Sequence, residues 1–172
     1  PNTLPMKEVL EARDKTGLLI PGVVCGATWR SQLSHADPAV RAKGVELVKQ
    51  SLNACKQYGG TTVLVIPGVV GAETSYGDAY KRSQEEVKKL LSEAEKTGVK
   101  IAFENVWNNF LLSPVECARF VDEINHPMVG WYFDVGNVVR YGWPEHWIEA
   151  LGKRILKLDI KEYSRKKQFE EG

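Results

Sequence analysis

Three apolar segments in the second half of the chain each close on a carboxylate, and their spacing constrains the fold more than any other feature. One lies within Val99–Val106 and closes at Glu104; the others are Val129–Asp134 and Arg154–Asp159. Apolar runs of this kind are typical of strands that are buried on both faces. Each interval between them has room for one helix, which is the crossover that neighbouring parallel strands require. We therefore predict three parallel strands whose acids lie at one rim of a sheet.

Two earlier segments, Leu18–Gly26 and Thr61–Ile66, extend this pattern to the whole chain. Both are apolar or β-branched and are bounded by glycine or proline, so both predict strands. Helical periodicity precedes or separates the strands: Met6–Lys15 is predicted to be the end of a helix, and helix starts are predicted at Asp37, Asp78, Ser113 and Trp143. The helix from Asp78 is predicted to run unbroken to Thr97. This alternation predicts an α/β protein with helices outside a parallel sheet.

The alternation fits two architectures, an open doubly wound sheet or part of a (β/α)8 barrel. A doubly wound nucleotide-binding protein would carry a glycine-rich fingerprint after its first strand, and no such spacing is present. Acids at the carboxyl ends of strands favour the barrel, because barrel enzymes place their chemistry there. Five strands do not close a barrel of eight. The sequence therefore predicts one partial barrel domain over residues 1–172, or a sheet that is open in this chain.

Composition limits the classes of partner. The chain has 172 residues, 43% hydrophobic and 26% charged, with a formal net charge of +1. This balance predicts neither a nucleic-acid nor an anionic-membrane partner, and no apolar run reaches membrane-spanning length. Cys25, Cys55 and Cys117 lack metal-ligand spacing. Dispersed cysteines in odd number favour free thiols in a reducing compartment, and hence a cytoplasmic protein.

Three carboxylates at one rim repel one another unless a cation joins them. Strand alternation predicts that Glu104, Asp134 and Asp159 point inward, whereas Leu156, Leu158 and Ile160 point to the helices. Oxygen ligands of this kind suit a hard ion such as Mg²⁺ or Mn²⁺, which could polarise a sugar carbonyl while a carboxylate takes a proton. In the alternative interpretation, each acid caps a helix or pairs with a lysine. Lys157, on the same face as Asp159, could neutralise it in place of a metal.

Loop residues near the same rim provide further candidates for substrate contact. Glu73 and Arg30 follow predicted strands, and Trp107 could form the wall of a substrate pocket. Aromatic residues near helix starts are also common in protein cores, so both interpretations of Trp107 stay open. The three histidines show no ligand spacing and are expected at the surface.

The segments Phe103–Asn105, Phe133–Asn137 and Leu158–Glu162 together resemble the metal-binding strand ends of xylose-isomerase-like TIM barrels. These proteins include sugar and sugar-phosphate isomerases and 3-epimerases. The resemblance extends from Leu18 to about Arg165. It implies a (β/α)8 barrel that holds Mn²⁺, Mg²⁺ or Co²⁺, with about five βα units, strands two to six, present in this chain.

The resemblance also implies roles for individual residues. Glu104 would be the first metal ligand and a catalytic acid/base, and Asp134 would be the second ligand. Asn137 stands where family members often have a histidine that contacts substrate, and Arg165 matches a substrate-contacting arginine. Asp159 stands where the family usually has a metal-binding histidine, which would make the site harder and more anionic. The family's final glutamate ligand, from its last strand, has no counterpart in this sequence.

The expected function is a divalent-metal-dependent sugar or sugar-phosphate isomerase or 3-epimerase that transfers a proton through an enediolate. The substrate contacts would come from Asn137, Arg165, Glu73, Trp107 and Lys157. One alternative is an inosose-type dehydratase, which would use the same acids to expel a hydroxyl group. Another, which is not an enzyme, is a non-catalytic barrel that binds a sugar or a metal ion. The expected partner is a small sugar or sugar phosphate. Two exposed strand edges would favour association, including homo-oligomers, and no turnover is expected from this chain by itself.

Overall fold

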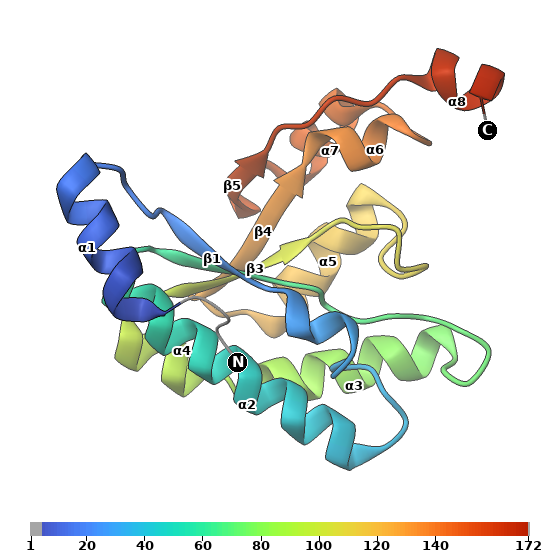
Figure 1. Cartoon of the computed structure of the whole chain (residues 1–172). Coiled ribbons are helices and arrows are strands. Elements are labelled where there is room, and N and C mark those ends of the chain that lie inside the picture. The colour runs from blue at the N-terminus through green and yellow to red at the C-terminus, as the bar shows by residue number, and fades with distance from the viewer. Residues whose placement is uncertain (1–4, 172) are drawn as a thin grey trace.

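The computed structural model describes residues 5–171, and its centre is a five-stranded parallel sheet in which the strands are neighbours in chain order. The strands are β1 (Gly22–Cys25), β2 (Thr62–Val65), β3 (Lys100–Glu104), β4 (Val129–Asp134) and β5 (Ile155–Asp159). The sheet curves like one side of a barrel wall (Figure 1). The predicted alternation of helices with five parallel strands is confirmed.

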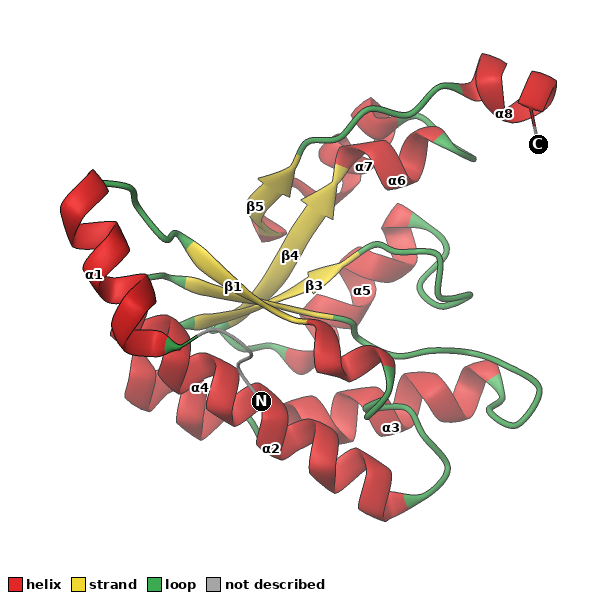
Figure 2. Cartoon of the chain, in the orientation of Figure 1, coloured by secondary structure: helices red, strands yellow, loops and turns green. Residues whose placement is uncertain are grey.

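The helices are α1 (Met6–Thr16), α2 (Pro38–Tyr58), α3 (Tyr76–Lys88), α4 (Leu91–Thr97), α5 (Pro114–Ile124), α6 (Val135–Val139), α7 (Pro144–Leu151) and α8 (Arg165–Glu171). Helices α2 to α5 connect the first four strands and lie on the convex side of the sheet, whereas α1 precedes the sheet and α8 extends away from it (Figure 2). Short 3-10 turns span Gly26–Trp29 and Gly152–Arg154. The terminal helices α1 and α8 bury none of their residues. Within residues 5–171, no helix is both long enough and apolar enough to cross a membrane.

Side chains cap the N-termini of α2 and α5, which lie on either side of the central strands in the chain. Asp37 accepts a hydrogen bond from the Ala39 backbone N–H at 2.8 Å, and a proline occupies the first turn of α2. Ser113 accepts the backbone N–H of Glu116 at 3.2 Å at the start of α5. Glu116 in turn accepts the N–H of Leu112 at 3.1 Å, one residue before the cap. Ser113 and Glu116 therefore form a capping box in which the glutamate reaches back one residue further than usual.

The helix predicted as continuous from Asp78 to Thr97 is in fact two helices, α3 and α4. The backbone N–H groups of Lys89 and Leu90 bond three residues back, to the carbonyls of Glu86 and Val87, which tightens the turn and breaks the α-helical ladder. The Lys89 ammonium lies 2.6 Å from the buried carboxylate of Glu86 and stabilises this turn.

The convex face of the sheet carries the hydrophobic core. Its central outward side chains are fully buried, namely Val63, Val65, Ile101, Phe103, Trp131 and Phe133. Phe103 meets Phe120 of α5 edge-on at 5.4 Å between ring centroids, and Phe133 stacks on Trp147 of α7 at 6.2 Å. A buried valine, isoleucine or phenylalanine contributes about 1.5–3 kcal/mol to folding. This core fixes the orientation of the strands, so the opposite, concave face is determined as well.

A β-bulge sets the register between β4 and β5. Ile155 pairs with Trp131, but the next residue of β4, Tyr132, pairs with Lys157, so Leu156 is an extra residue in β5. Leu156 was predicted to point to the helices, and that prediction is wrong. Its Cγ would lie 2.6 Å from a Cβ at Gly130, so the leucine side chain occupies the space that a side chain at position 130 would need.

Downstream of the bulge, the outward residues of β5 have little cover. Leu158 pairs with Phe133 and therefore points outward as predicted, yet it is 52% exposed, and Ile160 is 71% exposed. The helix cover over the centre of the sheet does not extend over this edge strand in the described residues.

Candidate metal centre

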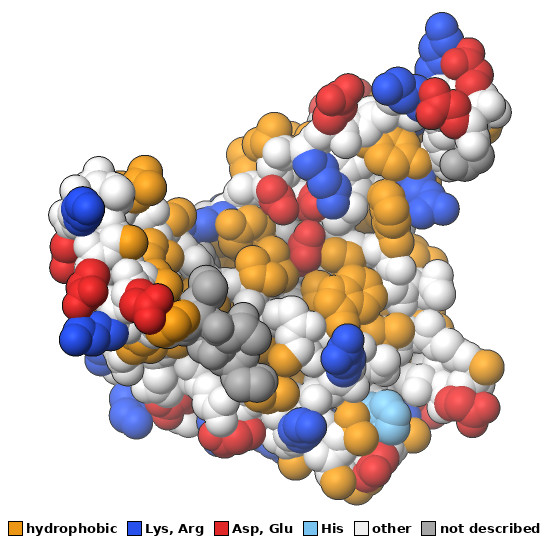
Figure 3. All heavy atoms as spheres, viewed as in Figure 1, with side chains coloured by type: hydrophobic (Ala, Val, Ile, Leu, Met, Phe, Trp, Pro, Cys, Tyr) orange, Lys and Arg blue, Asp and Glu red, His pale blue; other side chains and the backbone are white. Residues whose placement is uncertain are grey.

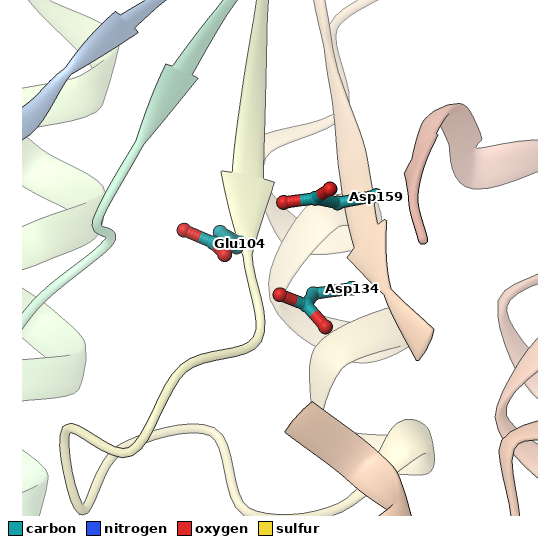
Figure 4. Close-up of side chains that lie close together, drawn as sticks. All are labelled: Glu104, Asp134 and Asp159. Atoms are coloured by element: carbon teal, nitrogen blue, oxygen red, sulfur yellow. The ribbon is translucent and has the colours of Figure 1, made fainter. Parts of the chain in front are cut away.

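Glu104, Asp134 and Asp159 come together at the carboxyl ends of β3, β4 and β5, as the strand pattern predicts. One carboxylate oxygen from each residue lies within 4.8 Å of the other two. The carboxyl groups of Asp134 and Asp159 point towards the strand end that carries Glu104 (Figure 4). In the space-filling view, acidic, basic and apolar side chains line the hollow between α1 and the arm formed by β5 and α8 (Figure 3).

Asp134 is the buried member of this cluster, with a side chain that is 0% exposed. Its Oδ1 accepts the backbone N–H of Asn137 at 2.8 Å and so caps α6. Its Oδ2 lies 2.7 Å from the ammonium nitrogen of Lys161 but has no hydrogen bond of acceptable geometry. A buried carboxylate oxygen that lacks a directed donor is unfavourable, and a cation bound at this position would compensate it.

Asn105 fixes the backbone that carries Asp134. Its side-chain Nδ2 donates to the carbonyl of Asp134 at 2.7 Å, while its Oδ1 accepts the backbone N–H of Asp134 at 3.0 Å. The same Oδ1 accepts the indole N–H of Trp131 at 3.1 Å. The side chain of Asn137 donates to the carbonyl of Asn105 at 2.8 Å. This buried network holds the ends of β3 and β4 together next to the acids.

Glu104 has a strongly perturbed carboxyl group. Burial, followed by the negative charge of Asp134, raises its pKa to about 7, and Asp159 adds to the effect. The ammonium of Lys161 opposes the shift. Near neutral pH, Glu104 therefore exists in both protonation states, which suits a group that must accept and return a proton.

The two lysines near the cluster reach in opposite directions. Lys157 donates to the backbone carbonyl of Pro21 at 2.6 Å, a residue just before β1. The cation that pairs with an acid of the cluster is instead Lys161. Sequence reasoning missed Lys161, although it stands two residues after Asp159, where alternation continued past the end of β5 would place both on one face.

Trp107 lies at the rim next to Lys161. Its indole N–H donates to the carbonyl of Asn137 at 3.2 Å, and the residue is 48% exposed. The guanidinium of Arg140 lies 4.5 Å from the ring centroid, the Lys161 ammonium 5.9 Å, and Tyr163 packs edge-on. An exposed, fixed indole beside the acids fits the wall of a pocket for a small polar molecule.

The side chains of the remaining residues predicted to contact substrate do not contact the three acids. Asn137 is buried and both its backbone and its side chain take part in the network described above. The guanidinium of Arg165 donates to the carbonyls of Val139 and Gly142 and lies over the ring of Trp143. Glu73 is exposed in the loop between β2 and α3. None of these side-chain contacts involves the three acids.

The chain matches the model of a protein family described as xylose isomerase-like TIM barrel over residues 2–172. A curated relative, L-ribulose-5-phosphate 3-epimerase UlaE of Escherichia coli K12, is 23% identical over 124 residues, which is 72% of this chain and 44% of the relative. The chain thus spans less than half the length of that relative.

Solved structures show the same fold. A D-tagatose 3-epimerase-like protein superposes with a TM-score of 0.81 at 21% identity, covering 92% of this chain and 62% of that one. The structure of L-ribulose 3-epimerase gives a TM-score of 0.78 at 20% identity, covering 94% of this chain and 57% of the other. Because the family model covers nearly the whole sequence, the chain belongs to the xylose isomerase-like TIM barrel family.

Proposed function

We propose that this chain forms the metal-binding part of a sugar or sugar-phosphate isomerase or 3-epimerase that depends on a divalent ion. The observation that carries the proposal is the convergence of Glu104, Asp134 and Asp159, together with the buried Oδ2 of Asp134 that lacks a directed hydrogen bond. The activities after which the relatives are named, 3-epimerisation of L-ribulose 5-phosphate and of a free ketose, support the substrate class.

The three carboxylates would hold Mn²⁺, Mg²⁺ or Co²⁺, because these hard or borderline ions prefer oxygen ligands. When bound, such an ion polarises the carbonyl of a ketose and offsets the negative charge that develops on its oxygen.

Glu104 would move the proton at the carbon next to that carbonyl. Its carboxylate would accept this proton, and the resulting acid would return it. Trp107 is the substrate-binding candidate that the geometry supports best, since its exposed ring lies beside the cluster. Asn137, Arg165 and Lys157 have their polar groups engaged by backbone carbonyls, so a substrate would have to compete with those contacts.

Hydrogen exchange with solvent tests the proposal. The protein, loaded with Mn²⁺, is incubated in D2O with a panel of ketoses and ketose phosphates, and the sugars are analysed by NMR. Deuterium next to the carbonyl of the recovered sugar, lost in Glu104→Gln, is the expected result, because Glu104 can remove and return a proton even where no product forms. Release of water from the substrate would favour the dehydratase. Metal binding without exchange on any sugar would favour a non-catalytic barrel.

A further inference from the structure

Lys161 places a positive charge where the acid cluster is most deeply buried. Its ammonium nitrogen lies 2.7 Å from Oδ2 of Asp134, a side chain that is 0% exposed, whereas the Lys161 side chain is 45% exposed. Without this lysine, the buried carboxylate of Asp134 would have no ion-pair partner among the described residues. An uncompensated buried charge is strongly unfavourable, so the ion pair stabilises the ion-free protein.

The backbone of Lys161 is fixed at the rim, although its side chain is long and partly exposed. A Cβ at Gly136 would lie 2.7 Å from the carbonyl oxygen of Lys161, so the two backbones are in close contact. The ammonium can therefore move only as far as the Lys161 side chain reaches from this fixed backbone. It already lies 5.9 Å from the centroid of the Trp107 ring, an exposed aromatic face that attracts cations.

The contact between Lys161 and Asp134 also lacks the geometry of a hydrogen bond, since Oδ2 has no directed donor. The ammonium thus neutralises the oxygen without occupying its lone pairs in the optimal direction. A lysine engaged in this way is easier to displace than one held by several directed bonds.

We propose that Lys161 is a built-in counter-cation of the acid cluster, and that a divalent ion enters the site by displacing its ammonium from Asp134. This inference rests on the proposed metal site and adds a competing group to it. The displaced ammonium moves towards solvent and the Trp107 ring. Lys161 is thus a positioning residue that keeps the acids together when no ion is bound and lowers the affinity for the ion.

Metal affinity gives the first test, measured by isothermal titration of Mn²⁺ into the metal-free protein. Lys161→Met removes the competitor, so it is expected to bind Mn²⁺ about 10- to 100-fold more tightly than wild type. Lys161→Arg keeps the charge and is expected to stay within a few-fold of wild type. Lys166→Met is the matched control, because it removes the same charge from an exposed lysine of α8 that pairs with Glu170.

Chemical labelling gives the second test and reports displacement directly. The acetylation rate of Lys161, followed by mass spectrometry, is expected to rise several-fold when Mg²⁺ saturates the site, while that of Lys166 stays constant. Tighter Mn²⁺ binding by Lys161→Met without this rise would overturn displacement, because the ammonium would then remain beside the ion. Equal or weaker binding by Lys161→Met would overturn the counter-cation role altogether. Absence of Mn²⁺, Mg²⁺ and Co²⁺ binding in wild type and Lys161→Met alike would instead refute the metal site itself.

Discussion

Asn105 pairs its side-chain amide with both backbone polar groups of Asp134, accepting the N–H at 3.0 Å and donating to the C=O at 2.7 Å. These two hydrogen bonds extend the backbone hydrogen bonding between β3 and β4 by one step, with the Asn105 side chain in the place of a backbone amide. Glu104 is the residue before Asn105, so the contact sets the separation of two acids of the cluster.

Replacing Asn105 with alanine is expected to destabilise the protein by about 3 kcal/mol, since three buried hydrogen bonds of about 1 kcal/mol each are lost. Urea denaturation monitored by circular dichroism measures the change. Asn53→Ala, an exposed asparagine of α2, should cost about 0.5 kcal/mol or less. Equal losses in the two variants would mean that the Asn105 network contributes nothing beyond an ordinary surface contact.

Gly136→Ala is expected to weaken both stability and Mn²⁺ binding. The added Cβ would overlap the side chain of Lys161 and lie 2.7 Å from its carbonyl oxygen, so α6 and the segment that follows β5 must separate. Overpacking of this kind costs about 1–3 kcal/mol. Gly77→Ala is the matched control, because a Cβ there meets nothing within 4 Å. Thermal denaturation and Mn²⁺ titration of both variants check the prediction, and an unaffected Gly136→Ala protein would contradict it.

The stability of the metal-free protein should fall as pH rises from about 4.5 to about 7. In this window, Glu104 keeps its proton in the folded state, where its pKa is raised from 4.5 to about 7, but has lost it in the unfolded chain. The folded state therefore binds more protons, and the free energy of unfolding decreases with pH. Glu104→Gln should remove this component of the slope in urea titrations performed with EDTA. An identical pH dependence in wild type and Glu104→Gln would rule out the raised pKa.

Asp159→His should change the metal preference. A neutral imidazole is a softer ligand than a carboxylate, so Mg²⁺ affinity is expected to fall about tenfold or more while Co²⁺ binding is largely retained. Asp159→Asn controls for loss of charge alone and should weaken both ions. Calorimetric titrations with each ion distinguish the variants, and an unchanged ratio of Mg²⁺ to Co²⁺ affinity in Asp159→His would show that position 159 does not bind the metal.

Much of the architecture was predictable because it follows from local patterns. Apolar runs that end in Glu104, Asp134 and Asp159 predict parallel strands and a shared rim, and the capping residues Asp37 and Ser113 predict helix starts that the structure confirms. These signals lie within a few residues of the features they predict, so no knowledge of distant contacts is needed.

The partners of the lysines were not predictable in the same way. Lys157 bonds to the carbonyl of Pro21, which is 136 residues away in the chain, and no local pattern reveals such a contact. With Lys157 engaged at that end of the sheet, Lys161 is the lysine that pairs with Asp134. Alternation gives the face on which a side chain lies, but it does not give the direction of a long side chain along that face.

The single extra residue at Leu156 has a consequence for how this rim can change during evolution. If Leu156 paired with Tyr132 and no residue bulged, Leu158 would stand opposite Asp134, and Asp159 would point towards the helices. The face on which Asp159 lies therefore depends on Leu156 being left out of the strand pairing as a bulge. Deleting Leu156 would remove the bulge but leave Asp159 opposite Asp134, whereas deleting Leu158 would place Asp159 opposite Phe133, on the helix face. Loss of one codon after the bulge could therefore abolish a ligand here without any substitution at position 159.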